Sequence, residues 1–521
     1  MKKLKSIPFH FLLIAAFQIL SLYAINVNKA DISAALSILF LTVFLVALLF
    51  LVILVITRDV QRSGVIATFY CFLFFIYGRL YDVIPGLQIG GLVIGRNKYL
   101  LPVYVVVLIA GTLLIFRSQW FKKSLNGITW FLNVFGLALV AISILMAVTN
   151  YDWTMHVKNA DLKALKVNND SIIADAQATP SPQVSGLNKP NVYFMIFDSY
   201  ASPEVLRKYY GWNDHDFVNA LRSRGFTVNE NAFSNYPFTS LSINSYLNMG
   251  YVHEDPEFSS AKSKSAYLAN RIKQNKVMSY FKSQGYNVVA PNMGNEENKT
   301  KKENVAVNNR AGSLFSNELM VSVIQTSFLR IIEFELLSDS LRNAILSEMR
   351  DLSHADVPSK PTFLYSHIIC PHPPYIFRED GSKPKIYESA WGRFENRNEY
   401  IGQIRFVGRK IIEIVDSIKK RDPGAVVIVR ADHGHGYIVG DHLLNRGKPP
   451  LEFLEAQHGI LDATYLPAGI SIPEKSTPAN LFRYLFNALF NARLAILPDK
   501  AFFTPIKEPF AFYEVTNDLK K

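Results

Sequence analysis

Cysteine is scarce in this chain, which has only Cys71 and Cys370 among its 521 residues. Cys71 lies within a long apolar segment and Cys370 follows a predicted strand, so the two are not placed to pair. The sequence therefore excludes a disulfide-stabilised fold. It also lacks any evident internal repeat, and its organisation has to be read from hydropathy and motifs.

Charge is the next absence, because no charged residue occurs between Ala34 and Ile56. A water-soluble helix needs a polar face, so this segment is expected to span a membrane. It is one of five apolar stretches near the N-terminus, each about long enough to cross a hydrocarbon core as a helix. These stretches are 8–27, 33–56, 64–82, 99–116 and 127–148. The sequence predicts a transmembrane domain of five helices over residues 1–150.

Lysine and arginine are unevenly divided between the ends of these segments, which predicts their orientation. The heavier positive load falls on one side and consists of Lys2, Lys3, Lys5, Arg58, Arg62, Arg117, Lys122 and Lys123. We expect this side in the cytoplasm and everything after Tyr151 outside it. The first segment also has the Lys-rich start of a signal peptide. Its apolar region is too long for one, and Tyr23-Ala24 is a poor cleavage site.

A polar stretch, residues 151–190, follows the apolar part. Its composition predicts a juxtamembrane helix near 160–176 and then an extended tether. The formal net charge of +12 is explained by loop lysines and arginines that set topology, so we expect no nucleic-acid partner. A basic outer domain near anionic headgroups is compatible with this charge. An exported domain without disulfides suits the inner, cytoplasmic membrane of a bacterium, with this domain on its periplasmic or extracellular side.

Residues 191–521 form the predicted outer domain, in which apolar strands alternate with amphipathic segments. This pattern predicts an α/β fold with a mostly parallel central sheet. The predicted strands are 191–197, 287–291, 361–366, 425–431 and 461–466. The predicted helices are 213–224, 240–249, 266–284, 316–350, 394–421 and 477–491. The helix 394–421 is the best marked, because its isoleucines and Val407 fall on one face.

Two of the apolar strands end on residues that bind hard metal ions. The strand 425–431 is followed by Asp432 and His433, and the strand 191–197 is followed by Asp198. In a parallel α/β sheet, ligands bind beyond the C-terminal ends of the strands. Packing alone does not explain these groups at two strand ends, so the pattern predicts a metalloenzyme.

A hydroxyl pair, Thr239-Ser240, follows Pro237 and opens an apolar helical pattern. A hydroxyl at a helix start faces free backbone amides, which favour anions such as phosphate. The alternative is that Thr239 is a plain N-cap residue.

Histidines supply the remaining candidates. His367 and His372 follow the strand 361–366, in a loop stiffened by three prolines. We expect both imidazoles to point into the same cleft, although a loop histidine is more often a surface residue. His458, before the strand 461–466, is a further candidate, and His435 and His442 compete with it.

Residues from about 190 to 495 resemble the sulfatase-like branch of the alkaline phosphatase superfamily. Four motifs in the family order carry the resemblance: Phe197-Asp198-Ser199, Pro237-Phe-Thr239-Ser, His367-x4-His372-Pro-Pro-Tyr and Ala431-Asp432-His433-Gly434. Five spans before such a domain are also similar to phosphoethanolamine transferases of lipid A and to lipoteichoic acid synthases.

The resemblance implies roles for these residues. Asp198, Thr239, Asp432 and His433 would bind one divalent metal, Zn²⁺ or Mn²⁺, with Mg²⁺ also possible. Thr239 would be the nucleophile and form a phosphothreonine intermediate. His372 would contact the transferred phosphate or protonate the leaving alcohol. A role in substrate binding or at a second metal would fall to His367, His372 and His458.

The resemblance also implies a reaction, which is transfer of a phosphoethanolamine- or phosphoglycerol-type headgroup. The donor would be a membrane phospholipid and the acceptor an envelope glycan or lipid, as in lipopolysaccharide modification. The chain departs from both groups of transferases in having Asp198 where they have Glu. The segment between Asp432 and His458 is also longer than in the phosphoethanolamine enzymes. The donor headgroup and the acceptor therefore stay open.

Three other functions compete with headgroup transfer. A phosphodiesterase or phosphatase would use the same site with water as acceptor, but it would not need five membrane spans. A sulfate-ester hydrolase is disfavoured, because the Cys/Ser-x-Pro-x-Arg motif that yields formylglycine does not occur. A scaffold with an inactive fold would have lost the nucleophile or a metal ligand, and none is lost here.

Overall fold

The structure is a computed structural model of the whole chain. It describes residues 7–27, 32–83, 88–89, 92–93, 97–151, 189–261, 264–290, 318–354, 357–384, 396–440, 447–506 and 508–520. The predicted juxtamembrane helix 160–176 and His442 lie outside these residues. The chain divides into two compact units. One consists of Met1–Lys158 with Gly312–Leu341, and the other of Asn159–Ala311 with Arg342–Lys521.

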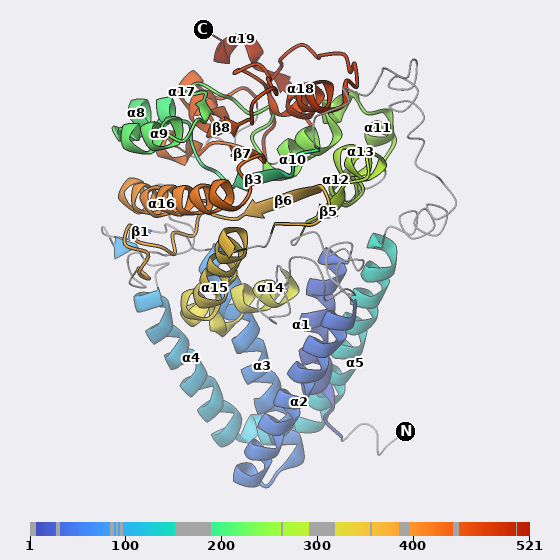
Figure 1. Cartoon of the computed structure of the whole chain (residues 1–521). Coiled ribbons are helices and arrows are strands. Elements are labelled where there is room, and N and C mark those ends of the chain that lie inside the picture. The colour runs from blue at the N-terminus through green and yellow to red at the C-terminus, as the bar shows by residue number, and fades with distance from the viewer. Residues whose placement is uncertain are drawn as a thin grey trace. The chain divides into compact units, whose positions relative to one another are not determined.

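The first unit, called the helical unit below, contains five apolar N-terminal helices (Figure 1). They are α1 (His10–Asn26), α2 (Ile32–Thr57), α3 (Val60–Val83), α4 (Asn97–Arg117) and α5 (Gln119–Asn150), with a two-residue hairpin of β1 (Gln88–Ile89) and β2 (Leu92–Val93). Within the described residues, α2 to α5 are long and apolar enough to cross a membrane, whereas α1 has only 17 residues. All five predicted apolar segments are thus helical.

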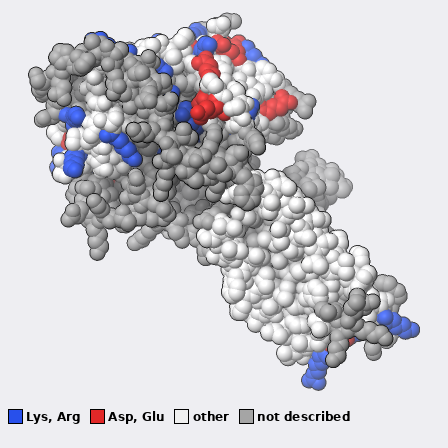
Figure 2. Space-filling view, turned by 90° about the vertical axis from the view of Figure 1, so that its right-hand side faces the viewer, with Lys and Arg blue, Asp and Glu red and all other residues white. Residues whose placement is uncertain are grey.

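The helices α2, α4 and α5 expose apolar side chains rather than polar ones. Phe40, Phe44 and Val55 on α2 are all well exposed. Figure 2 shows a broad uncharged surface over the helical unit, with lysine and arginine side chains gathered at its end. Such a surface is expected where the solvent is lipid.

Part of the later chain also belongs to this first unit. It comprises α14 (Glu318–Thr326), the 3₁₀ helix η6 (Phe328–Ile332) and the start of α15 (Glu333–His354). Ser327 interrupts the helical path, and its hydroxyl accepts a hydrogen bond from the Leu329 amide at 3.2 Å. The prediction of one helix over 316–350 was therefore wrong, because this serine caps a new turn.

The second unit, called the catalytic unit below, is built on a six-stranded sheet with the strand order β4-β8-β7-β3-β6-β5. The strands are β3 (Val192–Phe197), β4 (Thr227–Val228), β5 (Asn287–Val289), β6 (Thr362–Ile368), β7 (Val426–Arg430) and β8 (Asp462–Tyr465). β3 runs parallel to both β6 and β7, and β5 runs parallel to β6. Only β8 against β7 and β4 against β8 are antiparallel. This confirms the α/β fold with a mostly parallel sheet.

The second unit also contains α-helices between and after these strands, besides the end of α15. They are α8 (Pro203–Tyr210), α9 (His215–Arg222), α10 (Thr239–Asn248), α11 (Pro256–Ser260), α12 (Lys264–Lys273), α13 (Lys276–Ser283), α16 (Arg397–Arg421), α17 (Leu451–His458), α18 (Pro478–Phe490) and α19 (Thr516–Leu519). Shorter elements are η2 (Val252–Glu254), η7 (Gly436–Val439), β9 (Phe502–Phe503) and β10 (Tyr513–Glu514). The predicted single helix 266–284 was wrong. The Asn275 side chain accepts a hydrogen bond from the Met278 amide at 2.8 Å and starts α13 separately.

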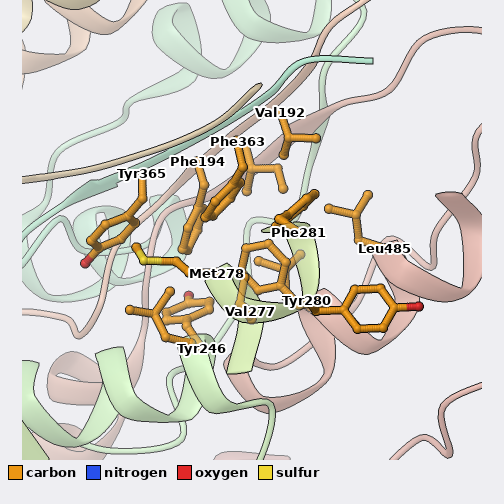
Figure 3. Close-up of a cluster of buried hydrophobic side chains, with 14 of the residues drawn as sticks. Val192, Phe194, Tyr246, Val277, Met278, Tyr280, Phe281, Phe363, Tyr365 and Leu485 are labelled. Carbon is orange, nitrogen blue, oxygen red and sulfur yellow. The ribbon is translucent and has the colours of Figure 1, made fainter. Parts of the chain in front are cut away.

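An aromatic core lies on one face of the sheet (Figure 3). Phe194 from β3 and Phe363 from β6 pack with Phe281 of α13 and Phe482 of α18. The rings of Phe281 and Phe363 are stacked with centroids 4.3 Å apart. Because β3 and its two neighbours are buried on both sides, their C-terminal ends are held in fixed positions. These three ends carry the candidate site.

Candidate active site

The ends of β3 and β7 are tied together through Asp432. Ser199, just past β3, has a left-handed backbone with φ 64°, and its amide donates to Asp432 Oδ1 at 3.1 Å. Its hydroxyl donates to the Gly434 carbonyl at 3.0 Å. Asp198 and Asp432 are both buried, and they follow the C-terminal ends of two adjacent parallel strands, where ligands bind in such sheets.

Imidazole groups complete a cluster around these carboxylates. Ligand atoms of Asp198, His367 and Asp432 all lie within 4.8 Å of one another. His367 Nε2 is 3.4 Å from Asp198 Oδ2. The sequence suggested that His367 lies beyond its strand, and this was wrong. β6 continues to Ile368, and His367 pairs in register with Ile196.

His433 Nε2 lies close to the other three residues to which the resemblance assigns the metal. It is 3.6 Å from Asp198 Oδ1, 3.6 Å from Asp432 Oδ2 and 3.3 Å from Thr239 Oγ1. Oxygen and nitrogen ligands about 2.0–2.2 Å from a tetrahedral ion lie roughly 3.3–3.6 Å from each other. The three distances from His433 Nε2 fall within or at the edge of this range.

The donor atoms are also prepared to receive a cation. His433 Nδ1 is 2.8 Å from the Gly434 carbonyl, so Nδ1 carries a hydrogen and Nε2 presents its lone pair. Asp198 Oδ1 and Asp432 Oδ2 are buried and have no hydrogen-bond partner among the described residues. Buried carboxylate oxygens without a partner are costly unless a cation neutralises them. The residues thus fit a divalent metal ion.

The carboxylates and imidazoles of the cluster also shift one another's pKa values. Burial alone would raise the pKa of Asp198, but His372, His367 and His433 hold it below its usual value. Burial would likewise lower the pKa of His367, yet the hydrogen bond and charge of Asp198 raise it to about 9. Asp432 and Asp198 also raise the pKa of His433 against the effect of its burial. A metal ion would displace these protons, so its binding strengthens as pH rises.

Thr239 is the first residue of α10 and is not its cap. The N-cap position is Phe238, and no side-chain cap hydrogen bond is present. The bland interpretation of Thr239 as an N-cap is therefore wrong. Its half-buried hydroxyl instead faces His433, at a helix start where the backbone amides favour a phosphoryl group.

His372 lies in a loop that one glutamine holds in place. Gln403, fully buried on α16, accepts hydrogen bonds from the amides of Ile376 and Phe377 at 2.9 and 3.1 Å. Its amide nitrogen donates to the carbonyls of Pro371 and His372 at 3.0 and 3.3 Å. Gln403 was missed in the sequence. The available signal was a glutamine beside the apolar face of a well-marked helix.

The His372 ring faces the cluster from this loop. Its centroid is 6.2 Å from that of His433. Nδ1 lies 2.5 Å from the Pro373 carbonyl and therefore carries a hydrogen. Nε2 is the ring nitrogen that this carbonyl does not contact.

The other candidate histidines are placed elsewhere. His458 is fully buried, and its Nδ1 lies 3.1 Å from the Ser234 carbonyl. Burial, with His433 nearby, lowers its pKa to about 4. His435 is enclosed by tyrosines, with its ring stacked 4.3 Å from Tyr400 and Nε2 3.0 Å from the Tyr375 hydroxyl.

Fold and site together define an α/β enzyme whose acidic and histidine-rich centre fits a divalent metal and lies at the C-terminal ends of adjacent parallel strands. The family model described as Sulfatase matches residues 190–458, and the chain belongs to this family. The match confirms the resemblance inferred from the four motifs. A search of curated proteins found no match.

Several solved structures are similar to the chain. The C-terminal periplasmic domain of EcEptC from Escherichia coli is 12% identical with a TM-score of 0.39, covering 63% of this chain and 93% of that chain. Its complex with Zn is 13% identical, with the same TM-score and coverage. The protein yidJ from Bacteroides fragilis is 15% identical with a TM-score of 0.35, covering 64% and 85%.

Proposed function

We propose that this sulfatase-family enzyme transfers a phospho-headgroup from a membrane phospholipid to an envelope glycan or lipid. Phosphoethanolamine and phosphoglycerol are the headgroup types considered. The observation that carries the proposal is the Thr239 hydroxyl, which is free of any capping role and lies 3.3 Å from His433 Nε2. A hydroxyl so placed serves a nucleophile better than it serves a helix.

The proposed cation site consists of Asp198, Thr239, Asp432 and His433. Its oxygen and nitrogen donors suit Zn²⁺ or Mn²⁺, and Mg²⁺ less well. When bound, the ion supplies positive charge that favours ionisation of a hydroxyl and stabilises phosphoryl oxygens. His367 contacts Asp198, so its assigned role is to orient that carboxylate or to contact substrate.

The proposed reaction has two steps. Thr239 Oγ1 loses its proton to solvent and attacks the phosphodiester phosphorus, and the bond between phosphorus and the lipid alcohol oxygen breaks. His372 Nε2 gives its proton to that oxygen. An acceptor hydroxyl then attacks the phosphothreonine and gives its proton to His372, the bond between phosphorus and Thr239 Oγ1 breaks, and Oγ1 regains a proton from solvent. The backbone amides at the start of α10 hold the phosphoryl charge in both steps.

The proposed location is a bacterial inner membrane, with an inside N-terminus, five spans and the catalytic unit outside. Arg58, Arg62 and Arg117 lie at helix ends that the positive-inside rule assigns to the cytoplasm. The proposed domains are residues 1–150, 151–190 and 191–521. A reporter fused after Pro190 is expected to behave as extracytoplasmic, and cytoplasmic behaviour would reject this topology.

The test of the proposed function is mass spectrometry of envelope lipids and polysaccharides from cells with and without the gene. Wild type should add a headgroup that Thr239→Ala does not add. Ser240→Ala is the matched control, because the neighbouring hydroxyl is exposed. Headgroup released as a free phosphomonoester, with no modified acceptor, would instead identify the runner-up, a phosphodiesterase. Full transfer by Thr239→Ala would reject the mechanism.

A further inference from the structure

A stretch of the chain that follows the first half of the catalytic fold is packed into the helical unit. Leu319 and Val323 of α14 are buried in the same apolar cluster as Ile19 of α1 and Phe75 of α3. Between Leu319 and Ile332 the only charged residue is Arg330. This composition fits an apolar environment far better than a water-exposed loop.

The backbones of α3 and α14 approach each other at a glycine. A Cβ atom on Gly78 would lie 2.0 Å from the Gln325 carbonyl oxygen and 2.6 Å from the carbonyl carbon of Thr326. No side chain fits in that space. Close helix contact through a small residue is the usual means of association inside membranes, so α14 packs against α3 as a neighbouring membrane helix would.

Aromatic side chains extend the contact beyond the glycine. The Phe328 ring lies 5.0 Å from Tyr77 and 5.4 Å from Tyr104, centroid to centroid. Arg330 sits 5.2 Å over the Tyr81 ring and pairs with Glu333 at 3.1 Å. The one charge in the stretch is thus neutralised and held against an aromatic face, a common arrangement at the membrane–water boundary.

The depth of this contact can be judged along α3, a helix of membrane-spanning length. Gly78 precedes the end of α3 at Val83 by five residues, which is about 7.5 Å along a helix axis. Interfacial helices bury their apolar faces about 5–10 Å into a bilayer. The distance of Gly78 from the end of α3 therefore matches the depth at which interfacial helices lie.

We propose that residues 319–332 are embedded in the bilayer interface where α3 ends, with lipid acyl chains as the partner of their exposed side. Ile332, 45% exposed, contacts lipid. α15 begins at the end of this stretch in the helical unit and ends in the catalytic unit. The chain of the catalytic unit is therefore joined to the membrane-embedded part at both ends of this stretch, in addition to the residues that follow α5.

The test uses the full-length protein in phospholipid vesicles, with a nitroxide attached to an Ile332→Cys variant. Both native cysteines are buried, and unlabelled wild type serves as the blank. Ile496→Cys, at an isoleucine 41% exposed in the catalytic unit, is the water-side control, and Val105→Cys on α4 is the lipid-side control. We expect oxygen to relax the label at 332 and at 105 several-fold more than a nickel chelate does. A label at 332 that behaves like the label at 496 overturns the proposal.

A second variant tests the glycine contact. Gly78→Leu, in the Ile332→Cys background, should move the label towards the water-side value, because the leucine displaces α14. Gly127→Leu is the matched control, since no atom lies within 4 Å of a Cβ at that position. Gly78→Ala provides a smaller change if the leucine variant does not fold. Lipid-like behaviour unaltered by either Gly78 variant would contradict the proposed packing.

Discussion

Around the helices α2, α4 and α5 the exposed side chains are apolar, whereas in the catalytic unit the apolar side chains form a buried core beneath the sheet. Polar groups follow the opposite arrangement. In the helical unit His10 and Thr68 are buried against each other, 2.5 Å apart. In the catalytic unit, buried carboxylate oxygens without a hydrogen-bond partner among the described residues occur at the strand ends. In both units, the polar groups that are buried mark the places where specific interactions are made.

Removing a buried carboxylate from the strand ends should have the largest effect. Asp432→Ala should abolish bound metal and reduce transfer by about 10³-fold or more, because several kcal/mol of charge stabilisation are lost. Metal content and product formation are measured on the same purified sample. Asp416→Ala is the control, since Asp416 is exposed and pairs with Arg224 on the surface. Normal metal content in Asp432→Ala would contradict the assignment.

His372→Ala should slow transfer by roughly 10²–10⁴-fold, as expected when a general acid is lost. A donor with a nitrophenol leaving group needs no proton, so its transfer should fall much less. The two donors are compared by stopped-assay rates. Equal losses with both donors would show that His372 binds the phosphoryl group rather than protonating the leaving group.

A lysine introduced into the exposed apolar surface distinguishes the two solvents directly. Leu45, near the middle of α2, is 52% exposed, and Ile496 in the catalytic unit is 41% exposed. Leu45→Lys should cost about 3 kcal/mol of membrane insertion, whereas Ile496→Lys should change stability by less than about 0.5 kcal/mol. Insertion is measured by the yield of membrane-integrated protein. Equal yields would contradict the membrane assignment of α2.

Gln403→Leu should reduce kcat by roughly 10–100-fold with little change in KM, because a small displacement of His372 misplaces a reacting group. Gln403→Glu keeps the acceptor for the two amides but loses the donor to Pro371 and His372, and should be intermediate. Steady-state kinetics with saturating lipid donor give both constants. A change confined to thermal stability would show that the glutamine has no positioning role.

Asp214 should give the smallest effect, seen as a pH dependence of stability. Burial raises the pKa of Asp214 to about 7, above its usual value. The folded protein therefore favours the protonated form, and this contribution is lost as pH rises from about 4 through 7. Wild type should lose roughly 1–3 kcal/mol between pH 5 and 8 through this group, and Asp214→Asn should lose less. Thermal unfolding at both pH values measures the difference, and parallel curves would contradict the shift.

Much of the catalytic site was predictable because it depends on strand ends. The alternation of apolar strands and helices placed Asp198, Asp432 and His433 together before any contact was known. Gln403 could not be assigned in this way, since its function depends on a loop more than twenty residues away in sequence. The breaks at Asn275 and Ser327 carry ordinary capping signals, but the apolar periodicity around them masked those signals.

The placement of residues 318–341 in the helical unit was also not predictable from the sequence. An apolar helical pattern such as Leu319 to Ile324 serves equally to cover a sheet or to pack against a membrane helix. The surface against which the helix packs decides between these two roles, and here that surface is the face of α3 that contains Gly78. Local pattern therefore identifies the element, and only tertiary contacts identify the unit to which it belongs.

The most direct test of the central claim is to trap the proposed covalent intermediate. Wild-type protein is mixed with phospholipid donor in the absence of acceptor, quenched in acid and digested, and the peptide containing Thr239 is analysed by mass spectrometry. The account predicts a phospho-headgroup on Thr239 that disappears when acceptor is added. Turnover without any adduct on Thr239, or an adduct on another residue, would contradict it.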